Sequence, residues 1–364
     1  MKKIISLLLC ILMLISAVGC KKEKYPEIKS TAEEARVVMT FKLGDEKYEM
    51  KYELYRALFL NYSEKYDNGD KAFWNSPESG NALAELNEKI VESALDIFST
   101  LHIAKKIGFD PYSKEAENKI AEYIETSVEG DGDTITGFGG DYDAYLASLK
   151  ASNMNYSVQK LLLRYSIAYD KIIEHYEGIS NENNPTENEE GAIKVTREDV
   201  LNFYNSDSAV RVSPITINAT YITYSRANEI RNSIASAESA SMALNIAIGS
   251  TTSIPSDILD GVVIGTHSLD SIYYKDITEA ALSLGENETS EVIYVATDIG
   301  KEYWILYGRE KSAEHFESNY EHIKGVYISQ KIGEIIDSAK KQLKDSLTET
   351  DSYKNLKHSE ISMK

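Results

Sequence analysis

Cysteine and histidine most often carry nucleophilic or metal chemistry in proteins, and this chain is poor in both. Its 364 residues include two cysteines, Cys10 and Cys20, and six histidines. Both cysteines lie near the amino terminus, so residues 21–364 cannot form a disulfide among themselves, ligate zinc through thiolates or use a thiol nucleophile. No histidine pair has metal-ligand spacing, and no glycine-rich phosphate loop or Ser/His/Asp order is present. We therefore expect neither a metal nor another cofactor.

The setting of Cys20 predicts a covalent modification of its thiol. A basic start, Lys2-Lys3, precedes an apolar run at 4–18, which ends in Ala17-Val18-Gly19-Cys20. This pattern is typical of a secretory signal peptide. The last four residues resemble a bacterial lipobox, in which the cysteine receives diacylglycerol and becomes the new N-terminus, although Ala17 stands where Leu is usual. An ordinary cleaved signal that contains a cysteine is the alternative.

The charge of the chain bears on its partners. A formal net charge of −19 argues against nucleic acid, because few cations would be free to neutralise phosphates. Simple solubility is one interpretation of this acidity, and attraction to basic or apolar polypeptides is another. With the signal peptide and lipid, the expected location is the extracytoplasmic face of the bacterial cell membrane.

The first half of the chain is predicted to be helical after one hairpin. Val37, Met39 and Phe41 alternate before a turn at Gly44-Asp45, which indicates a hairpin at 37–51. A loop at 129–143 contains Asp131-Gly-Asp133 but fails the calcium-loop pattern, because Thr136 stands where Gly is needed. Apolar residues at helical spacing, with Ser113 as an N-cap, predict helices at 52–66, 81–107, 113–128, 142–150 and 156–176.

The second half has a different pattern. A polar linker is followed by an expected strand at 214–224, a helix at 225–248, and two strands at 291–296 and 302–307. From Phe316 to Leu347 the chain carries one long apolar stripe. Such a helix needs a partner, and we expect it to pack on the helix at 81–107, which would make the helical domain discontinuous in sequence.

This order of segments resembles the PrsA/SurA-type extracytoplasmic foldases. Three stretches carry the resemblance: Tyr142-Asp-Ala-Tyr-Leu-Ala-Ser-Leu-Lys-Ala-Ser-Asn-Met-Asn155, Val195-Thr-Arg-Glu-Asp-Val-Leu-Asn-Phe-Tyr204 and Ile277-Thr-Glu-Ala-Ala-Leu-Ser-Leu284. It implies an α+β chain, with a discontinuous helical chaperone domain and an inserted small parvulin-like domain. The implied segments are a signal peptide at 1–19, a lipidated tether at 20–35, a SurA-like helical domain at 36–177, an acidic linker at 178–194, a parvulin-like domain at 195–311, a returning helix at 312–348 and a polar tail at 349–364.

The residues that should carry parvulin catalysis depart from the family pattern. Parvulins place a histidine on the first strand and another on the last, where this chain is expected to have Tyr221 and Trp304. The apolar positions that cradle proline, usually Met and Phe, correspond to Tyr273 and Ile277. Asp257, or Asp260 close by, stands in for a Cys or Asp that commonly lies nearby.

This departure bears on the chemistry. Prolyl isomerisation must lower a barrier of about 18–20 kcal/mol, which an apolar cradle and a polarised hydrogen-bond network can do. Two aromatic rings in place of two imidazoles keep the bulk and remove most of the network. The rings at Tyr221 and Trp304 are either a surface that grips peptides or ordinary residues of a degenerate domain. His267 is either a substitute catalytic histidine or a loop residue without a role.

Three functions are therefore weighed. The first is a membrane-anchored foldase or chaperone that assists unfolded or nascent secreted polypeptides, with weak or no prolyl isomerase activity. The second is an active peptidyl-prolyl cis-trans isomerase of the parvulin class. The third is a structural or assembly lipoprotein that binds one dedicated partner. A homodimer is compatible with each of them.

Overall fold

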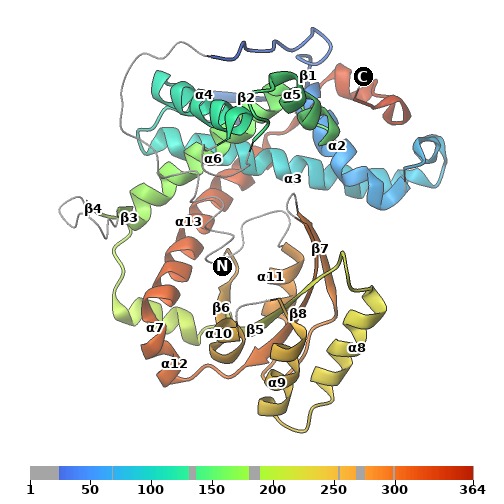
Figure 1. The fold of residues 1–364 in the computed structure, drawn as a ribbon. Helices are drawn as coiled ribbons and strands as arrows, with labels where there is room; N and C mark the ends of the chain where they lie inside the picture. The colour runs from blue at the N-terminus through green and yellow to red at the C-terminus, as the bar shows by residue number, and fades with distance from the viewer. Residues whose placement is uncertain are drawn as a thin grey trace. The chain divides into compact units, whose positions relative to one another are not determined.

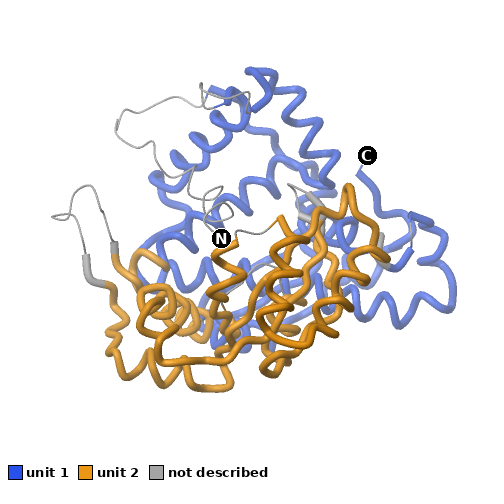
Figure 2. Tube along the Cα trace, turned by 60° about the horizontal axis from the view of Figure 1, so that its bottom comes forward, with its two compact units in different colours: residues 1–172, 336–364 blue, residues 173–335 orange. Residues whose placement is uncertain are grey.

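The computed structural model describes residues 24–67, 69–130, 137–179, 189–252, 255–267, 275–297 and 300–363. The predicted signal peptide and lipidation site at Cys20, and the acidic loop residues Asp131-Gly-Asp133, lie outside these residues. The chain divides into two compact units (Figure 2). Unit 1 comprises Met1–Ile172 and Ile336–Lys364, and unit 2 is the continuous segment Ile173–Ile335. The predicted α+β class is confirmed, because helices accompany small antiparallel sheets.

Unit 1 joins an amino-terminal helical block to the end of the chain (Figure 1). Two helices, α6 and α13, pass from one unit into the other. The described elements with residues in unit 1 are β1 (Val37–Leu43), β2 (Glu46–Lys51), α2 (Tyr52–Asp67), η1 (Lys71–Asn75), α3 (Ser79–Lys106), α4 (Lys114–Glu129), α5 (Tyr142–Ala151), α6 (Tyr156–Glu177), α13 (Tyr320–Asp345), β9 (Thr348–Glu349), α14 (Asp351–Lys354) and η3 (His358–Glu360).

The predicted hairpin is confirmed and gains a third strand. β1 pairs antiparallel with β2, with Phe41 opposite Tyr48, and Gly44 supplies the positive φ of 60° that the turn requires. Strand β9, near the end of the chain, pairs with the other edge of β1 at Met39 and Thr40. The order β2-β1-β9 therefore ties the two sequence segments of unit 1 together by backbone hydrogen bonds.

Local sequence signals position the helices of unit 1. Ser113 caps α4 as predicted, accepting a hydrogen bond from the Ala116 amide at 3.2 Å. Gly108, with φ of 95°, follows the end of α3. Within the described ranges, no helix combines the length and the apolar character needed to cross a membrane.

A partly buried polar cluster joins the hairpin to α3. The Nδ1 atom of His102 lies 2.9 Å from a Glu46 carboxylate oxygen and 3.0 Å from the Tyr48 hydroxyl. Lys105 donates to the other Glu46 oxygen at 3.1 Å, and the Tyr48 hydroxyl also donates to this carboxylate. Burial alone would raise the pKa of Glu46, but these hydrogen bonds outweigh it and lower the pKa to about 2.

The Glu46 cluster predicts how stability depends on pH. Because the folded-state pKa of about 2 lies below the usual 4.5, the contribution of Glu46 is complete above about pH 4.5 and is lost as the pH falls toward 2. Glu46→Gln should lower the free energy of unfolding at pH 7 and flatten its decline over that range, as measured by denaturant unfolding. Glu49→Gln, which removes an exposed partner of Lys47, is the control. Equal pH slopes for both variants would contradict this prediction.

Unit 2 is built on a four-stranded antiparallel sheet of order β6-β5-β8-β7. The two central strands, β5 and β8, pair from Arg211–Arg309 to Asn218–Glu302. The described elements that lie wholly in unit 2 are β3 (Gly178–Ile179), β4 (Glu189–Glu190), α7 (Arg197–Asn205), β5 (Ala209–Asn218), α8 (Tyr224–Ala235), α9 (Ala240–Ser250), α10 (Pro255–Asp260), β6 (Val262–Gly265), α11 (Lys275–Leu282), β7 (Ile293–Thr297), β8 (Gly300–Arg309) and α12 (Ala313–Ser318).

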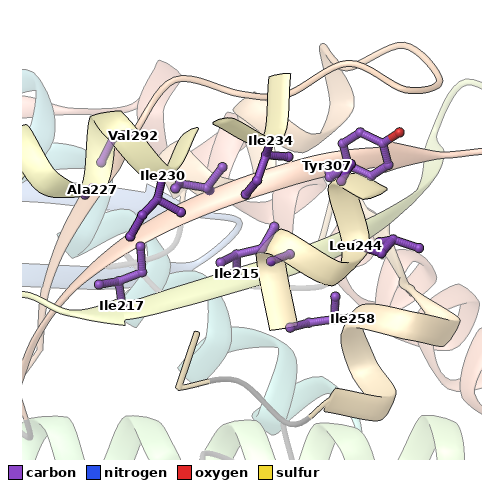
Figure 3. Packing of buried hydrophobic residues seen from close by; sticks show 12 residues of the cluster. Ile215, Ile217, Ala227, Ile230, Ile234, Leu244, Ile258, Val292 and Tyr307 are labelled. Carbon is purple, nitrogen blue, oxygen red and sulfur yellow. The ribbon is translucent and has the colours of Figure 1, made fainter. Parts of the chain in front are cut away.

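The sheet of unit 2 buries side chains on both faces. On one face Ile215 and Ile217 of β5 pack with Ile230 and Ile234 of α8, as Figure 3 shows. On the other face Val212 and Leu306 belong to a cluster with residues of α11. Alternate residues of β5 and β8 thus pack into two different cores, because successive side chains of a strand point to opposite faces of the sheet.

Several predicted boundaries in unit 2 are wrong. The strand expected at 214–224 ends at Asn218, because the Asn218 side chain accepts from the Thr220 amide at 2.8 Å and turns the chain. The single helix expected at 225–248 is two helices, since Ser239 caps a separate α9. In the expected linker at 178–194, Gly178–Ile179 pairs with Glu189–Glu190, after Gly178 ends α6 with φ of 96°.

The apolar stripe from Phe316 to Leu347 does not pack within the helical domain alone. It is broken at Asn319 between α12 and α13. Its first part lies in unit 2, where Phe316, Ile323 and Val326 pack in one cluster with Phe203 and other apolar residues that include α7 side chains. Only the part from Ile336 onward belongs to unit 1. There Lys340 pairs with Asp96 at 2.6 Å and Lys344 with Glu92 at 2.5 Å, both on α3.

Candidate functional site

Tyr221 does not occupy the strand position that the parvulin pattern requires. It lies in the turn between β5 and α8, and its side chain is 83% exposed. The Tyr221 amide donates to the Asn218 carbonyl at 3.4 Å, as part of the turn that ends β5. Tyr221 is therefore neither a core residue nor a member of the sheet, and its predicted position on a strand is wrong.

Trp304 and Ile277 lie on the α11 face of the sheet. Trp304 is on β8, paired with Thr216 of β5 and Ile293 of β7, and is half-buried against the α11 cluster. Its Nε1 atom donates to Glu302 at 3.0 Å. Ile277 of α11 is fully buried in the same cluster. The structure thus brings two of the predicted cleft residues together as packing side chains.

The other predicted residues do not join this pair. Asp257 lies on α10, next to Ile258, which is buried in the core of the opposite face. The Asp260 carbonyl accepts from Nε of Arg211 at 2.9 Å, which fixes the end of α10. Tyr273 lies outside the described residues. His267 follows β6, and its amide donates to Gln330 at 3.3 Å.

The geometry supports little acid–base chemistry on the α11 face. Neither β5 nor β8 contains a histidine. His315 is buried beside Tyr204, with Nδ1 3.0 Å from the hydroxyl, and burial lowers its pKa to about 4. In the part of the chain that the structure describes, no cluster of His, Cys, Asp and Glu has the arrangement of a metal site.

A group of tyrosines on the opposite face escaped the sequence analysis. The rings of Tyr224 on α8 and Tyr303 on β8 have centroids 5.9 Å apart, and Tyr294 on β7 lies 5.7 Å from Tyr303. Tyr224 is 51% exposed and Tyr294 is 49% exposed. We call these three residues the tyrosine cluster. The signal in the sequence was the abundance of tyrosine, but only the strand register brings these positions together.

Comparisons with known proteins give matches among solved structures only. No family model matches the chain, and the search of curated proteins finds no match. The foldase PrsA from Streptococcus pneumoniae is 17% identical, with 78% of this chain and 91% of that chain covered and a TM-score of 0.32. The chain is similar to PrsA foldases.

Two further PrsA structures match at similar levels. PrsA from Bacillus subtilis is 18% identical. The match covers 73% of this chain and 87% of the PrsA chain, with a TM-score of 0.24. The Bacillus cereus PrsA, described as a peptidylprolyl isomerase, is 18% identical, with 75% and 91% covered and a TM-score of 0.23. These matches are to PrsA structures, and PrsA is one of the two proteins that the resemblance drawn from the sequence names.

Proposed function

We propose that this chain is an extracytoplasmic foldase or chaperone that holds unfolded secreted polypeptides, with weak or no prolyl isomerase activity. The observation that carries the proposal is the tyrosine cluster, in which two exposed rings and one half-buried ring gather on one face of the sheet. The absence of histidine from β5 and β8 supports the low isomerase activity.

Exposed tyrosines suit transient capture of unfolded chains. A tyrosine ring offers a large apolar surface and loses few rotatable bonds when it is ordered, and its hydroxyl can bond to a peptide backbone. Contacts of this kind tolerate many sequences, because they do not depend on one pairing of charges. A net charge of −19 would also attract basic segments of a client over longer distances.

Aggregation of an unfolded client tests the proposal. We expect the purified chain to suppress aggregation of a chemically unfolded protein, measured by light scattering. The double variant Tyr224→Ser/Tyr294→Ser should suppress it several-fold less, because each of these two residues is about half exposed to a client. Tyr112→Ser is the matched control, since Tyr112 is 51% exposed and lies in unit 1. Equal suppression by the double variant and the wild type would contradict this assignment.

We also propose that Cys20 carries the lipid that tethers the chain to the membrane. The support is the order of the basic start, the apolar run and Ala17-Val18-Gly19-Cys20. Cys20→Ser should remain unprocessed or leave the membrane fraction, as followed by radiolabelled fatty acid and by fractionation. Lipid labelling and maturation equal to those of the wild type would contradict the anchor.

A further inference from the structure

The first described residues of the chain lie against helices of unit 1. We call residues 24–27 the docked segment, because they contact α4, α5 and α6 (Figure 1). Every residue in these contacts belongs to unit 1. The docked segment is part of the tether that the sequence predicts at 20–35, and the proposed holding role does not use it.

Tyr25 ties the docked segment to two helices. Its ring stacks on that of Tyr142 of α5, with centroids 5.0 Å apart and planes inclined by 27°. Its hydroxyl donates at 2.7 Å to the carboxylate of Glu129, the last residue of α4, and Lys24 pairs with the same carboxylate. The Tyr25 ring also packs against the buried cluster that α4 and α5 share. A stacked, partly buried ring fixes the position of the backbone that carries it.

The rest of the docked segment is held by a hydrogen bond and an ion pair. The Tyr142 hydroxyl donates to the Pro26 carbonyl at 2.7 Å. Glu27 pairs at 3.1 Å with Lys160 of α6, whose side chain is only 13% exposed. Lys160 is itself fixed by a second pair, with Glu117 of α4 at 3.0 Å. Four successive residues of the chain therefore have partners on three helices.

The docked segment lies at one end of a row of aromatic rings. The Tyr142 ring is 6.0 Å from that of Tyr145, which is 5.9 Å from the ring of Phe138. Phe138 is 38% exposed, and Ile28, directly after the docked segment, is 44% exposed. Among the described residues of unit 1, Tyr112 is the one other large hydrophobic residue that is exposed. Exposed aromatic and apolar side chains suit the headgroup region of a bilayer.

The length of chain before the docked segment limits how far it can lie from a lipid on Cys20. Only residues 21–23 separate Cys20 from Lys24, and an extended chain of this length spans at most about 14 Å. If residues 24–27 were free, the next fixed residue would be Ser30, whose hydroxyl donates to Glu53. The reach from Cys20 would then be about 35 Å. Docking thus more than halves the distance that the anchor allows.

We infer that the docked segment holds the side of unit 1 formed by α4 and α5 against a lipid surface. The short reach brings Tyr142 close to the headgroups, where the exposed side chains of Phe138 and Ile28 enter the interface. The intervening Lys21-Lys22-Glu23 has a net positive charge, which anionic headgroups attract although the whole chain is acidic. The inference rests on the proposed lipid at Cys20 and adds the surface that faces the bilayer.

Photo-crosslinking on vesicles tests the inference without relying on lipidation in the cell. Once the signal peptide is removed, Cys20 is the only cysteine, so its thiol can be coupled to a maleimide lipid in phosphatidylcholine vesicles. A second phospholipid carries a photoreactive diazirine on its headgroup, and mass spectrometry locates the crosslinks. We expect crosslinks at residues 137–151. If the coupled chain gives them but cells do not lipidate Cys20, the proposed anchor fails and the facing surface stands.

Two altered chains separate docking from reach. Tyr25→Ser/Glu27→Ser should lower crosslinking at 137–151 at least fivefold, because the segment loses its stacked ring and its ion pair. A twelve-residue Gly-Ser insertion between Glu23 and Lys24 leaves every docked residue in place and extends the reach to about 55 Å, so it should lower crosslinking equally.

Tyr221→Ser is the matched control, because Tyr221 is an exposed tyrosine of unit 2, and it should leave the crosslinks at 137–151 unchanged. Absence of these crosslinks from the unaltered chain overturns the inference. So does a loss of crosslinking in only one of the two altered chains. Loss with the insertion alone would show that docking does not hold this surface at the bilayer, and loss with the double variant alone would show that the short reach does not.

Discussion

Ending the chain after Ile335 is expected to unfold unit 1. The truncation removes β9 and three large buried aliphatic side chains, Ile336, Leu343 and Ile361. Burial of each contributes about 1.5–3 kcal/mol, so the three together approach the roughly 5–15 kcal/mol by which a whole domain is stable. Circular dichroism and thermal unfolding should show that the cooperative transition of the amino-terminal helices is lost.

A single substitution distinguishes the loss of one buried side chain from the loss of the whole C-terminal segment. Leu343→Ala should lower the free energy of unfolding by about 2–5 kcal/mol, because Leu343 is fully buried. Lys341→Ala, at an exposed position two residues earlier, should stay within about 0.5 kcal/mol of the wild type. If the truncated chain keeps the wild-type transition, the end of the chain is dispensable for unit 1 and the prediction is wrong.

Prolyl isomerase turnover is expected to stay near background. Tyr221 lies in an exposed turn outside the sheet, and the Trp304 Nε1 atom donates to Glu302. Neither can act as an imidazole does, and the described strands β5 and β8 carry no histidine. A barrier of about 18–20 kcal/mol would therefore be lowered little by this face.

A proline-limited peptide assay, read by coupled proteolysis or NMR exchange, measures this turnover. Suppression of client aggregation should persist in the same preparation. The assay should also include Trp304→Ala, because fast turnover that this variant abolishes would establish the parvulin-class isomerase instead. Fast turnover unchanged by Trp304→Ala would place an active site elsewhere in the chain.

Local signals predicted much of the fold. The hairpin followed from the alternation of Val37, Met39 and Phe41 and from Gly44, which are short-range features. The start of α4 followed from Ser113 for the same reason. The end of β5 did not, because Ala219 and Tyr221 continue the alternation of Ile215 and Ile217 into the turn before α8.

Long-range features were harder to predict. The apolar period of α13 indicates a buried face but does not say which unit covers each turn of the helix. For the site, alternation placed Trp304 on a strand, and the structure packs it in the α11 cluster with Ile277. The tyrosine cluster depends on strand register and on a helix some 70 residues earlier than β7, which single-sequence patterns do not specify.

The pairing of β9 with β1 sets the order in which the chain can fold. Met39 finds its partner Glu349 only when nearly the whole polypeptide has been made, whereas every described strand of the four-stranded sheet is present by Arg309. Contacts between such distant residues form slowly, since a long loop must close first. During synthesis from the amino terminus, the first helices are therefore made long before β9, the last strand of the sheet in unit 1. The four-stranded sheet of unit 2 can already be folded at that time.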